Sequence, residues 1–260
     1  MGLQYRLKAS FAENVNVPFR IQTKLFHIFK RTHSVKNIPI FINNYNRLDY
    51  LQRQIDWLRR SGHNNIHVID NCSTYAPLLN YYKKIPATVY RLDRNMGHEA
   101  FWRTHIFLRY NKSFYVLTDP DVVPGDDVPP DFMQYFIDVL NRYPAFKKVG
   151  FGLRTDNLPD HYPKKQEVIR WEEQFYEIEI EKGLFKSKID TTFALYRPGS
   201  KFQCWNETIR TGSPYMLMHL PWYEDPSMIT AETAYYLESC NASSSWYQAI
   251  SGRNKRYELR

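Results

Sequence analysis

The feature of this chain that most constrains its fold is a regular alternation of short apolar runs and amphipathic segments from residue 38 onward. Residues 48–60 carry apolar side chains at helical spacing, and residues 98–110 predict a second helix. Strand, helix and strand in this rhythm are typical of a parallel sheet whose strands are joined by helices, so we predict an α/β fold. Four apolar runs have the length and composition of buried strands, namely residues 38–42, 66–69, 88–92 and 113–118.

A polar cluster follows each of these four predicted strands. The carboxyl ends of parallel strands meet at one edge of a sheet, and ligands of open α/β sheets bind at that edge. We therefore expect the four clusters to form one site. They are residues 43–47, 70–74, 93–97 and 119–121.

The second half of the chain is less regular. Residues 131–141 and 227–240 predict helices, and residues 148–153 and 189–197 predict strands. Residues 171–180 are compatible with either a strand or a helix. The topology is therefore predicted only for the first half.

The segment Asp119-Pro120-Asp121 directly follows the fourth predicted strand. Two carboxylates one residue apart at a strand end can share one hard cation, and Mg²⁺ or Mn²⁺ held in this way completes its shell with water and phosphate oxygens. Such a cation neutralises charge on a departing diphosphate. The alternative is an Asp-Pro turn with a solvated aspartate. Because the pair ends a strand in a parallel series, we favour the metal site.

Asp70, Asn95 and Gly97 stand at the ends of the second and third predicted strands. A carboxylate at such a strand end can accept hydrogen bonds from a ribose hydroxyl or a base, although Asp70 can also cap the turn that follows it. Gly97 permits close backbone approach or a positive φ, and the helix that begins there offers free N–H groups to an anion. We therefore assign nucleotide-binding roles to these three residues.

The chain is basic, with a formal net charge of +8 and a pI near 9.2. Basic proteins bind polyanions, which include nucleic acid, anionic membrane and phosphorylated small molecules. Positive charge is concentrated in residues 1–36 and 251–260, and residues 19–31 have a helix-like spacing that suits packing on the domain or contact with an anionic membrane. Acidic side chains at the strand ends argue against nucleic acid as the partner.

Several common enzyme motifs are absent from the sequence. There is no G-x-G-x-x-G, no G-x-x-x-x-G-K-[ST] and no G-x-S-x-G, which disfavours dehydrogenases, P-loop NTPases and α/β-hydrolases. Cys72, Cys204 and Cys240 are widely spaced and form no C-x-x-C pair, which fits a reducing cytoplasm. No apolar run reaches the roughly 18 residues of a spanning helix.

Residues 38–124 resemble the nucleotide-binding half of GT-A glycosyltransferases, especially the large family 2-like group. The segments that carry the resemblance occur in the right order and spacing. They are residues 38–47, 68–74, 94–97 and 117–124.

The resemblance implies a GT-A (Rossmann-like) fold, which is a mixed, mostly parallel sheet flanked by helices. It implies a nucleoside-diphosphate-sugar donor, most often UDP-linked, and a divalent cofactor, Mn²⁺ or Mg²⁺. Asp119 and Asp121 would form the DxD metal motif, with Asp119 also at the donor, and Asp70 would contact the nucleotide. The turn that lines the nucleotide pocket would contribute Asn43, Asn44 and Arg47.

The segment around His219 looks like the late histidine of several metal-dependent GT-A enzymes, where it reaches the metal or the diphosphate. His219 can complete a coordination sphere of oxygen and nitrogen donors. The alternative is a packed histidine beside Trp222. The sequence leaves both interpretations open.

An inverting enzyme needs a carboxylate that deprotonates the acceptor hydroxyl. The Glu-Asp context that is usual in family 2 is not reproduced here. Asp225 is the preferred candidate, followed by Asp190, and Glu224 and Glu232 are further acids in this part of the chain. If none of them is the base, a retaining mechanism is favoured.

These features predict a hexosyltransferase that uses a nucleoside-diphosphate sugar, with a glycan or lipid-linked saccharide acceptor, in bacterial surface polysaccharide synthesis. We expect a cytoplasmic protein that is peripheral at the inner face of the membrane. The alternatives are a basic nucleic-acid-binding protein and a nucleotidyltransferase on a related fold. The nucleotidyltransferase is disfavoured because no Gly-rich phosphate loop follows the first predicted strand.

We divide the chain into four parts on this basis. A basic N-terminal segment, residues 1–36, precedes the nucleotide-sugar-binding half, residues 37–125. The acceptor-binding and catalytic half, residues 126–250, is followed by a basic tail, residues 251–260.

Overall fold

The computed structural model describes residues 4–7, 34–125, 127–189, 192–200, 204 and 206–240. The helix predicted over residues 19–31, the candidate base Asp190 and the basic tail lie outside the described residues. Among the described residues, no helix combines the length and apolar character that crossing a membrane requires.

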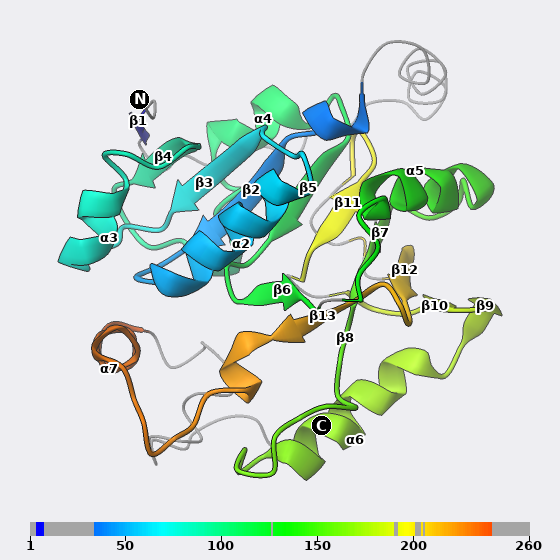
Figure 1. Cartoon of the computed structure of the whole chain (residues 1–260). Helices are drawn as coiled ribbons and strands as arrows, with labels where there is room; N and C mark the ends of the chain where they lie inside the picture. Colours follow the sequence, from blue (N-terminus) through cyan, green and yellow to red (C-terminus); the bar gives the residue numbers. More distant parts are fainter. Residues whose placement is uncertain are drawn as a thin grey trace.

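The chain alternates strands and helices through its first half and becomes richer in short strands in its second half (Figure 1). The helices are η1 (Val35–Asn37), α2 (Asp49–Arg60), α3 (Ala76–Tyr81), η2 (Gly97–Glu99), α4 (His105–Tyr110), α5 (Phe132–Arg142), α6 (Lys165–Glu173), η3 (Gln174–Tyr176), η4 (Leu220–Trp222) and α7 (Ala231–Ser239). The strands are β1 (Gln4–Leu7), β2 (Ile40–Asn44), β3 (Ile66–Asp70), β4 (Thr88–Leu92), β5 (Tyr115–Thr118), β6 (Val122–Pro124), β7 (Lys148–Gly150), β8 (Gly152–Leu153), β9 (Glu179–Glu181), β10 (Leu184–Lys186), β11 (Ala194–Tyr196), β12 (Thr208–Thr211) and β13 (Met216–His219).

Ten of these strands form one mixed sheet in the order β1-β4-β3-β2-β5-β11-β7-β12-β10-β9. The strands from β1 to β5 in this order are parallel, and β11 then runs antiparallel to both of its neighbours. Five of the nine neighbouring pairs are parallel, so the predicted fold class, an α/β domain with a mixed, mostly parallel sheet flanked by helices, is confirmed. The pairing of β1 with β4 was not predicted.

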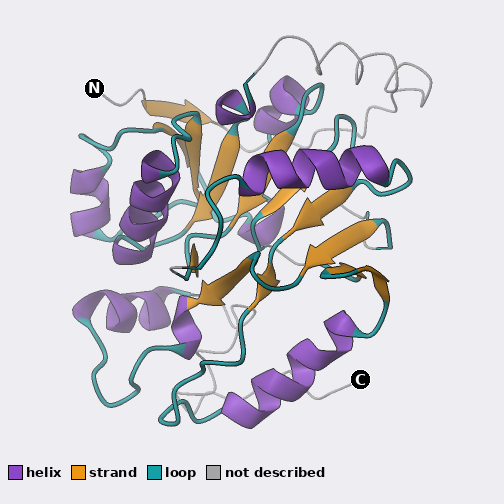
Figure 2. Ribbon diagram, turned by 45° about the vertical axis from the view of Figure 1, so that its right-hand side comes forward, coloured by secondary structure: helices purple, strands orange, loops and turns teal. Residues whose placement is uncertain are grey.

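Alternate strand residues face two separate apolar clusters, because successive side chains of a strand point to opposite faces of the sheet. One cluster joins Ile40, Ile42 and Val116 to α2, α3 and α5. The other joins Phe41 and Tyr115 to α4 and the turns before it. Helices therefore cover both faces, and Figure 2 shows α5 crossing one of them as the long purple helix.

A second, three-stranded sheet lies beyond the carboxyl end of β5, in the order β6-β13-β8 (Figure 1). Its β6 continues from β5 after only three residues, and β13 pairs antiparallel with it, which sets His219 opposite Val122. This small sheet brings residue 219 to the end of the central parallel strands.

The predicted strand over residues 148–153 divides between the two sheets. β7 belongs to the large sheet and β8 to the small one, with buried Phe151 between them. The chain passes so close to its neighbours here that a Cβ at Gly152 would lie 2.3 Å from both the Thr211 carbonyl oxygen and the Tyr176 hydroxyl. Glycine therefore allows the change of sheet.

Two further predictions are only partly right. The helix predicted over residues 98–110 begins at His105, because Thr104 is extended (φ −126°, ψ 166°) and the preceding Phe101 packs into the second apolar cluster. Residues 171–180, compatible with a strand or a helix, contain both, since α6 ends at Glu173 and β9 begins at Glu179.

Candidate functional site

The ends of β2, β3 and β4 are joined by amide side chains. The Asn71 amide donates to the Asn43 side-chain oxygen and to the Gly97 carbonyl, both at 2.8 Å, and its own oxygen accepts from the Met96 N–H at 2.9 Å. The Asn43 amide also donates to the Gly97 carbonyl, at 3.2 Å, and the Asn95 side chain accepts from the Gly97 N–H at 2.8 Å. We call Asn43, Asn71 and Gly97 the amide latch.

The amide latch lies next to the end of β5. Ile42 pairs with Thr118, so Asn43 neighbours Asp119 across two parallel strands, which are about 4.8 Å apart in a sheet. The prediction that the four polar clusters share one edge is therefore confirmed. The structure brings Asn43, Asn95 and Gly97 together at this edge, beside the Asp119–Asp121 turn.

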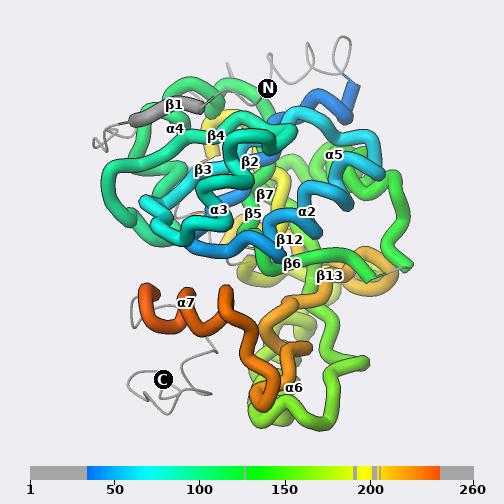
Figure 3. The backbone as a smooth tube through the Cα atoms, turned by 60° about the vertical axis from the view of Figure 1, so that its left-hand side comes forward, coloured from blue at the N-terminus to red at the C-terminus, as the bar shows by residue number. Residues whose placement is uncertain are grey.

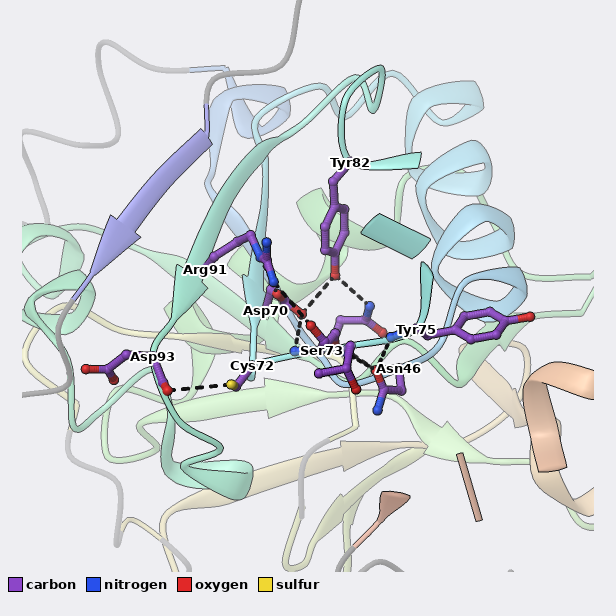
Figure 4. Close-up of polar contacts among 10 residues, drawn as sticks. Asn46, Asp70, Cys72, Ser73, Tyr75, Tyr82, Arg91 and Asp93 are labelled. Atoms are coloured by element: carbon purple, nitrogen blue, oxygen red, sulfur yellow. Dashed lines mark hydrogen bonds and ion pairs between the residues drawn. The ribbon is translucent and has the colours of Figure 1, made fainter. Parts of the chain in front are cut away.

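Asp70 is turned into the protein instead of facing this edge (Figure 4). Its carboxylate is fully buried and accepts from the Ser73 N–H and the Tyr82 hydroxyl, both at 3.2 Å, and from the Arg91 guanidinium at 3.0 Å. Burial, and then the charge of Asp70, raise the pKa of the Tyr82 hydroxyl well above its ordinary value, so this hydroxyl stays protonated and donates. These contacts fit the turn-capping alternative, and a direct contact of Asp70 with a nucleotide stays a prediction.

Asn44 is also turned inward. Its side chain is fully buried, and its amide donates to the Tyr82 hydroxyl at 3.0 Å. Its backbone carbonyl accepts from the Asn71 N–H at 2.9 Å. In this structure Asn44 therefore supports the amide latch from beneath, and its predicted place in the pocket wall stays untested.

Asn46, which was not among the predicted pocket residues, connects three segments. Its backbone is left-handed (φ 51°), a conformation that asparagine tolerates better than most residues. Its side-chain oxygen accepts from the N–H groups of Thr74 and Tyr75, at 2.8 and 3.0 Å (Figure 4). Its amide donates to the Ser239 hydroxyl at 2.9 Å. Asn46 thus ties the loops after β2 and β3 to α7.

Asp121 faces His219 across the β6–β13 pairing. The Asp121 Oδ2 and His219 Nε2 atoms are 3.4 Å apart. The His219 ring also packs at 4.6 Å from the Trp222 ring, and its Nδ1 is buried with no hydrogen-bond partner in the part of the chain that the structure describes. His219 therefore packs on Trp222 and also faces Asp121, and its role as a metal ligand stays a prediction.

Positive charge keeps Asp121 ionised. Burial raises the pKa of this carboxyl, but the neighbouring His219 and the Arg47 guanidinium outweigh that effect and hold the pKa below its ordinary value. The side chain is still 26% exposed, so it can meet a ligand. Asp121 is therefore a carboxylate at neutral pH.

Arg47 is held close to Asp121 by α7. Its guanidinium carbon lies 4.8 Å from the Tyr50 ring centroid and 4.0 Å from that of Tyr236, and it donates to the Thr233 hydroxyl at 3.1 Å. The side chain is buried, which strengthens its electrostatic effect on nearby groups. The predicted pocket residue Arg47 thus contributes a fixed positive charge.

The donor atoms at the end of β5 fit a divalent cation. No three His, Cys, Asp or Glu side chains are grouped as metal ligands within the described ranges. Asp121 and His219 nevertheless present a carboxylate oxygen and an imidazole nitrogen side by side, and Asp119 lies on the same turn. Mg²⁺ and Mn²⁺ need only one or two protein ligands when phosphate oxygens and water supply the rest.

The candidate bases differ in their surroundings. The Asp225 carboxylate accepts from the Ser227 hydroxyl and N–H at 2.7 and 2.8 Å, and these hydrogen bonds lower its pKa. Glu224 accepts from the Tyr50 hydroxyl and from Thr233. The structure therefore places Glu224 among the residues that hold Arg47, whereas Asp225 stabilises its own turn.

Glu232 has a structural role at the start of α2. Its two carboxylate oxygens accept from the Asp49 N–H at 3.1 and 3.3 Å, which satisfies a free donor at the helix N-terminus. Burial raises its pKa. Glu232 also connects α7 to α2, and Figure 3 shows α7 beside the loops after β2 and β3, outside the layers of the large sheet.

Gln54 is a further residue of the site that was not predicted from the sequence. It is fully buried on α2, and its amide reaches the Asp119–Asp121 turn. The signal was available, because a glutamine within the apolar stripe of a predicted helix is unusual. No sequence signal indicated that α7 packs beside the site, because its contacts are made with residues about 160 to 190 positions away.

Comparisons with known proteins give a likeness of fold. No protein-family model and no curated protein sequence matches the chain. Among solved structures, S. aureus TarS 1–349 aligns with 13% identity and a TM-score of 0.42, over 70% of this chain and 60% of that one. M. tuberculosis glucosyl-3-phosphoglycerate synthase, solved with Mn²⁺, UDP-glucose and phosphoglyceric acid, aligns with 14% identity and a TM-score of 0.38, over 74% and 64%.

A cytidylyltransferase from Leptospira borgpetersenii aligns over 47% of this chain and 56% of its own, with 12% identity and a TM-score of 0.34. The chain thus spans between about half and two thirds of these solved chains. The solved structures include GT-A glycosyltransferases. The likeness concerns the fold and carries no assignment of substrate or metal.

Proposed function

We propose that this chain is a glycosyltransferase that moves a hexosyl group from a UDP-linked sugar to a glycan or lipid-linked saccharide. The observation that carries the proposal is the Asp121–His219 pair at the carboxyl end of a central parallel strand, directly beside the amide latch. An ionised carboxylate, an imidazole and a set of neutral amides at one sheet edge match the chemistry of a nucleoside diphosphate with its cation.

Asp121 and His219, with Asp119 on the same turn, are the residues that would hold Mn²⁺ or Mg²⁺. When bound, the cation supplies Lewis-acid stabilisation of the departing diphosphate. Arg47 adds a fixed positive charge close enough to Asp121 to lower its pKa. Together these groups would stabilise the negative charge of the departing diphosphate at the end of β5.

The amide latch is proposed to bind the nucleoside. Asn95 and Gly97 are exposed at its outer edge, where backbone and amide groups can meet a base or a ribose. Asp70 and Asn44 act from beneath by fixing the loops that carry these groups. The selection of uridine over other nucleosides is part of the proposal.

Asp225, the preferred candidate for the catalytic base, is poorly suited to that role. A general base works best when its pKa lies near the working pH, and the Ser227 hydrogen bonds move the pKa of Asp225 in the wrong direction. In a transfer assay, Glu224→Gln, Asp225→Asn and Asp190→Asn should be compared. The base is the residue whose replacement lowers kcat by about 100-fold or more with KM for the donor unchanged.

The metal and donor proposal is tested by thermal stabilisation. UDP with Mn²⁺ at a hundredfold excess over Kd is expected to stabilise the folded chain by about 2.7 kcal/mol. Asp121→Ala should remove the Mn²⁺-dependent part, whereas Asp138→Ala, an exposed acid on α5, should leave it intact. Equal stabilisation of wild type and Asp121→Ala would remove the assignment of the metal.

The same screen separates the alternative functions. Stabilisation by CTP or another nucleoside triphosphate, without a response to UDP or UDP-sugars, would favour a nucleotidyltransferase. Retardation of random duplex or single-stranded nucleic acid would favour the nucleic-acid-binding alternative. Neither result is expected, because no Gly-rich phosphate loop follows the first predicted strand and the acidic side chains at the strand ends argue against nucleic acid.

A role in bacterial surface polysaccharide synthesis at the inner face of the membrane is proposed from the charge of the chain ends. A basic residue close to an anionic membrane contributes about 1 kcal/mol to binding. Replacement of the basic side chains of residues 19–31 by glutamine, which leaves β1 in place, should therefore weaken co-sedimentation with vesicles that contain anionic lipid. Unchanged partitioning would remove the membrane part of the proposal and leave the enzymatic part intact.

A further inference from the structure

One polar side chain is inserted into the apolar face of α2. Gln54 is fully buried between Leu51 and Leu58, which pack into the main core. Its side-chain oxygen has no hydrogen-bond partner among the residues that the structure describes. A buried, unpaired amide oxygen lowers stability, so packing alone does not account for a glutamine at this position.

The Gln54 amide nitrogen points at the turn that follows β5. It lies 3.1 Å from the Thr118 hydroxyl oxygen, 2.8 Å from the Asp119 carbonyl and 2.9 Å from the Val122 carbonyl. The Thr118 hydroxyl itself donates to the Asp119 carbonyl at 3.0 Å, so it presents a lone pair to Gln54. Because the acceptors surround one end of the amide, the nitrogen must occupy that end.

These bonds hold the turn on both sides of Asp121. Gln54 binds the carbonyls of Asp119 and Val122, and the Leu220 N–H donates to the intervening Asp121 carbonyl at 2.8 Å. The carbonyl groups of the turn are therefore fixed by α2 on one side and by the segment after β13 on the other. The backbone of Asp121, the residue that faces His219, therefore has little freedom to move.

We propose that Gln54 is the positioning residue of the metal-binding turn. This proposal rests on the proposed function, because it assumes that Asp121 and its neighbours bind a divalent cation. Gln54 does not touch the cation or the substrate. It holds the backbone from which Asp119 and Asp121 project, so that their carboxylates are in place before the donor arrives.

The principal test is Gln54→Met, which keeps the volume of the side chain and removes both N–H donors. In the presence of UDP, the Kd for Mn²⁺ is expected to rise by about 10- to 100-fold, the usual effect of removing a group that orients a metal ligand. The matched control is Ile55→Val, the next residue on α2, which removes one buried methylene and does not reach the turn. It should leave the Kd for Mn²⁺ unchanged.

A second measurement does not require the metal. The Leu220 amide donates to the Asp121 carbonyl, so its hydrogen exchange reports the order of the turn. Exchange at Leu220 should accelerate by about tenfold in Gln54→Met and stay unchanged in Ile55→Val, with both compared at equal global stability. If Gln54→Met does not fold, Gln54→Asn, whose amide is too short to reach both carbonyls, replaces it.

The outcomes separate the two proposals. If Asp121→Ala loses Mn²⁺ binding and Gln54→Met does not, Gln54 has no positioning role, although the metal site stands. If wild type binds no Mn²⁺ but Leu220 exchange is accelerated in Gln54→Met, the metal assignment fails and the ordering of the turn by Gln54 is retained. Unchanged Leu220 exchange together with unchanged Mn²⁺ affinity overturns the inference.

Discussion

The amide latch and the Asp121–His219 pair lie along one sheet edge, but they are assembled from different parts of the chain. The latch joins neutral side chains and a carbonyl that are at most 54 residues apart, within consecutive strand–helix units. The Asp121–His219 pair joins residues from opposite halves of the chain, and the Arg47–Thr233 contact beside it spans 186 residues.

In the proposed function, this difference separates the neutral side of the site, the amide latch that would bind the nucleoside, from the charged side around Asp121 and His219. The latch groups bond to one another as soon as β2, β3 and β4 form a sheet, so this side is preorganised without a ligand. The charged side depends on elements that join the site late in the sequence, namely β13 and α7. We expect the two sides to respond differently to pH and to substitution.

Acid is expected to have the largest effect, and it should act through two buried histidines that lie outside the Asp121–His219 pair. His67 on β3 and His63 after α2 are buried, and burial lowers the pKa of each from 6.5 to about 4. Below pH 6.5 the unfolded chain takes up protons that the folded chain accepts only near pH 4, so stability is lost as the pH falls through this window. At pH 5 each histidine should lower the free energy of unfolding by about 2 kcal/mol.

Urea unfolding at pH 7 and pH 5 measures this effect. His67 stacks on Phe41 and Tyr90, so His67→Phe should fold and lose about half of the pH dependence. Asp121 should not contribute in this range, because its lowered pKa keeps it ionised until the pH falls below its ordinary value. A wild-type stability that is equal at both pH values would contradict the assignment.

Breaking the support beneath the latch comes next in size. Arg91→Leu leaves the fully buried Asp70 carboxylate without its cation, and removing one partner of a buried pair lowers stability by about 3 kcal/mol. Arg53→Leu is the control, because its partner Asp49 is 54% exposed and such surface pairs contribute less than about 1 kcal/mol. Equal losses in the two variants would show that Asp70 does not depend on Arg91.

The latch itself is tested by Asn71→Asp, which keeps the shape of the side chain. One carboxylate oxygen would then face the Asn43 oxygen and the Gly97 carbonyl without a hydrogen between them, so stability at pH 7 should fall by about 2 kcal/mol. Nucleotide binding without metal should weaken as well. Asn80→Asp on the exposed side of α3 is the matched control and should change stability by less than about 0.5 kcal/mol.

The same contrast shows what the sequence can predict. The four strands and their polar ends were predictable because alternating apolar runs and helical spacing are local signals, and parallel pairing follows from them. Asn43, Asn95 and Gly97 therefore lie where the sequence placed them. Asp70 was located at the right strand end, but its inward orientation depends on Tyr82 and Arg91, which no local pattern connects to it.

For the charged side of the site, the sequence predicted which residues take part but not how they pair. Asp119 and Asp121 follow from their place after a strand, and His219 came from a resemblance, yet the pairing of His219 with Asp121 requires the register of β6 and β13. Gln54 was missed, and α7 was predicted as a helix within residues 227–240 but not as a neighbour of the site, because the contacts of both cross the fold. Asp225 was preferred as the base although the usual Glu-Asp context is not reproduced, and its carboxylate is used by its own turn.

The smallest expected effect concerns the attachment of α7, the element that makes the charged side dependent on distant sequence. Only Thr233 of this helix is buried, so α7 is held by a few polar and aromatic contacts and should open before the rest of the fold. Thr230→Ala removes the hydroxyl that accepts from the Thr233 N–H, which should weaken the helix by about 1 kcal/mol. Hydrogen exchange of the α7 amides should therefore accelerate by about fivefold while the global melting temperature and the exchange of β3 stay unchanged.

Thr230→Ser retains the hydroxyl and should restore slow exchange. If both variants exchange like wild type, α7 is fixed by the sheet edge itself, and the charged side is as preorganised as the amide latch.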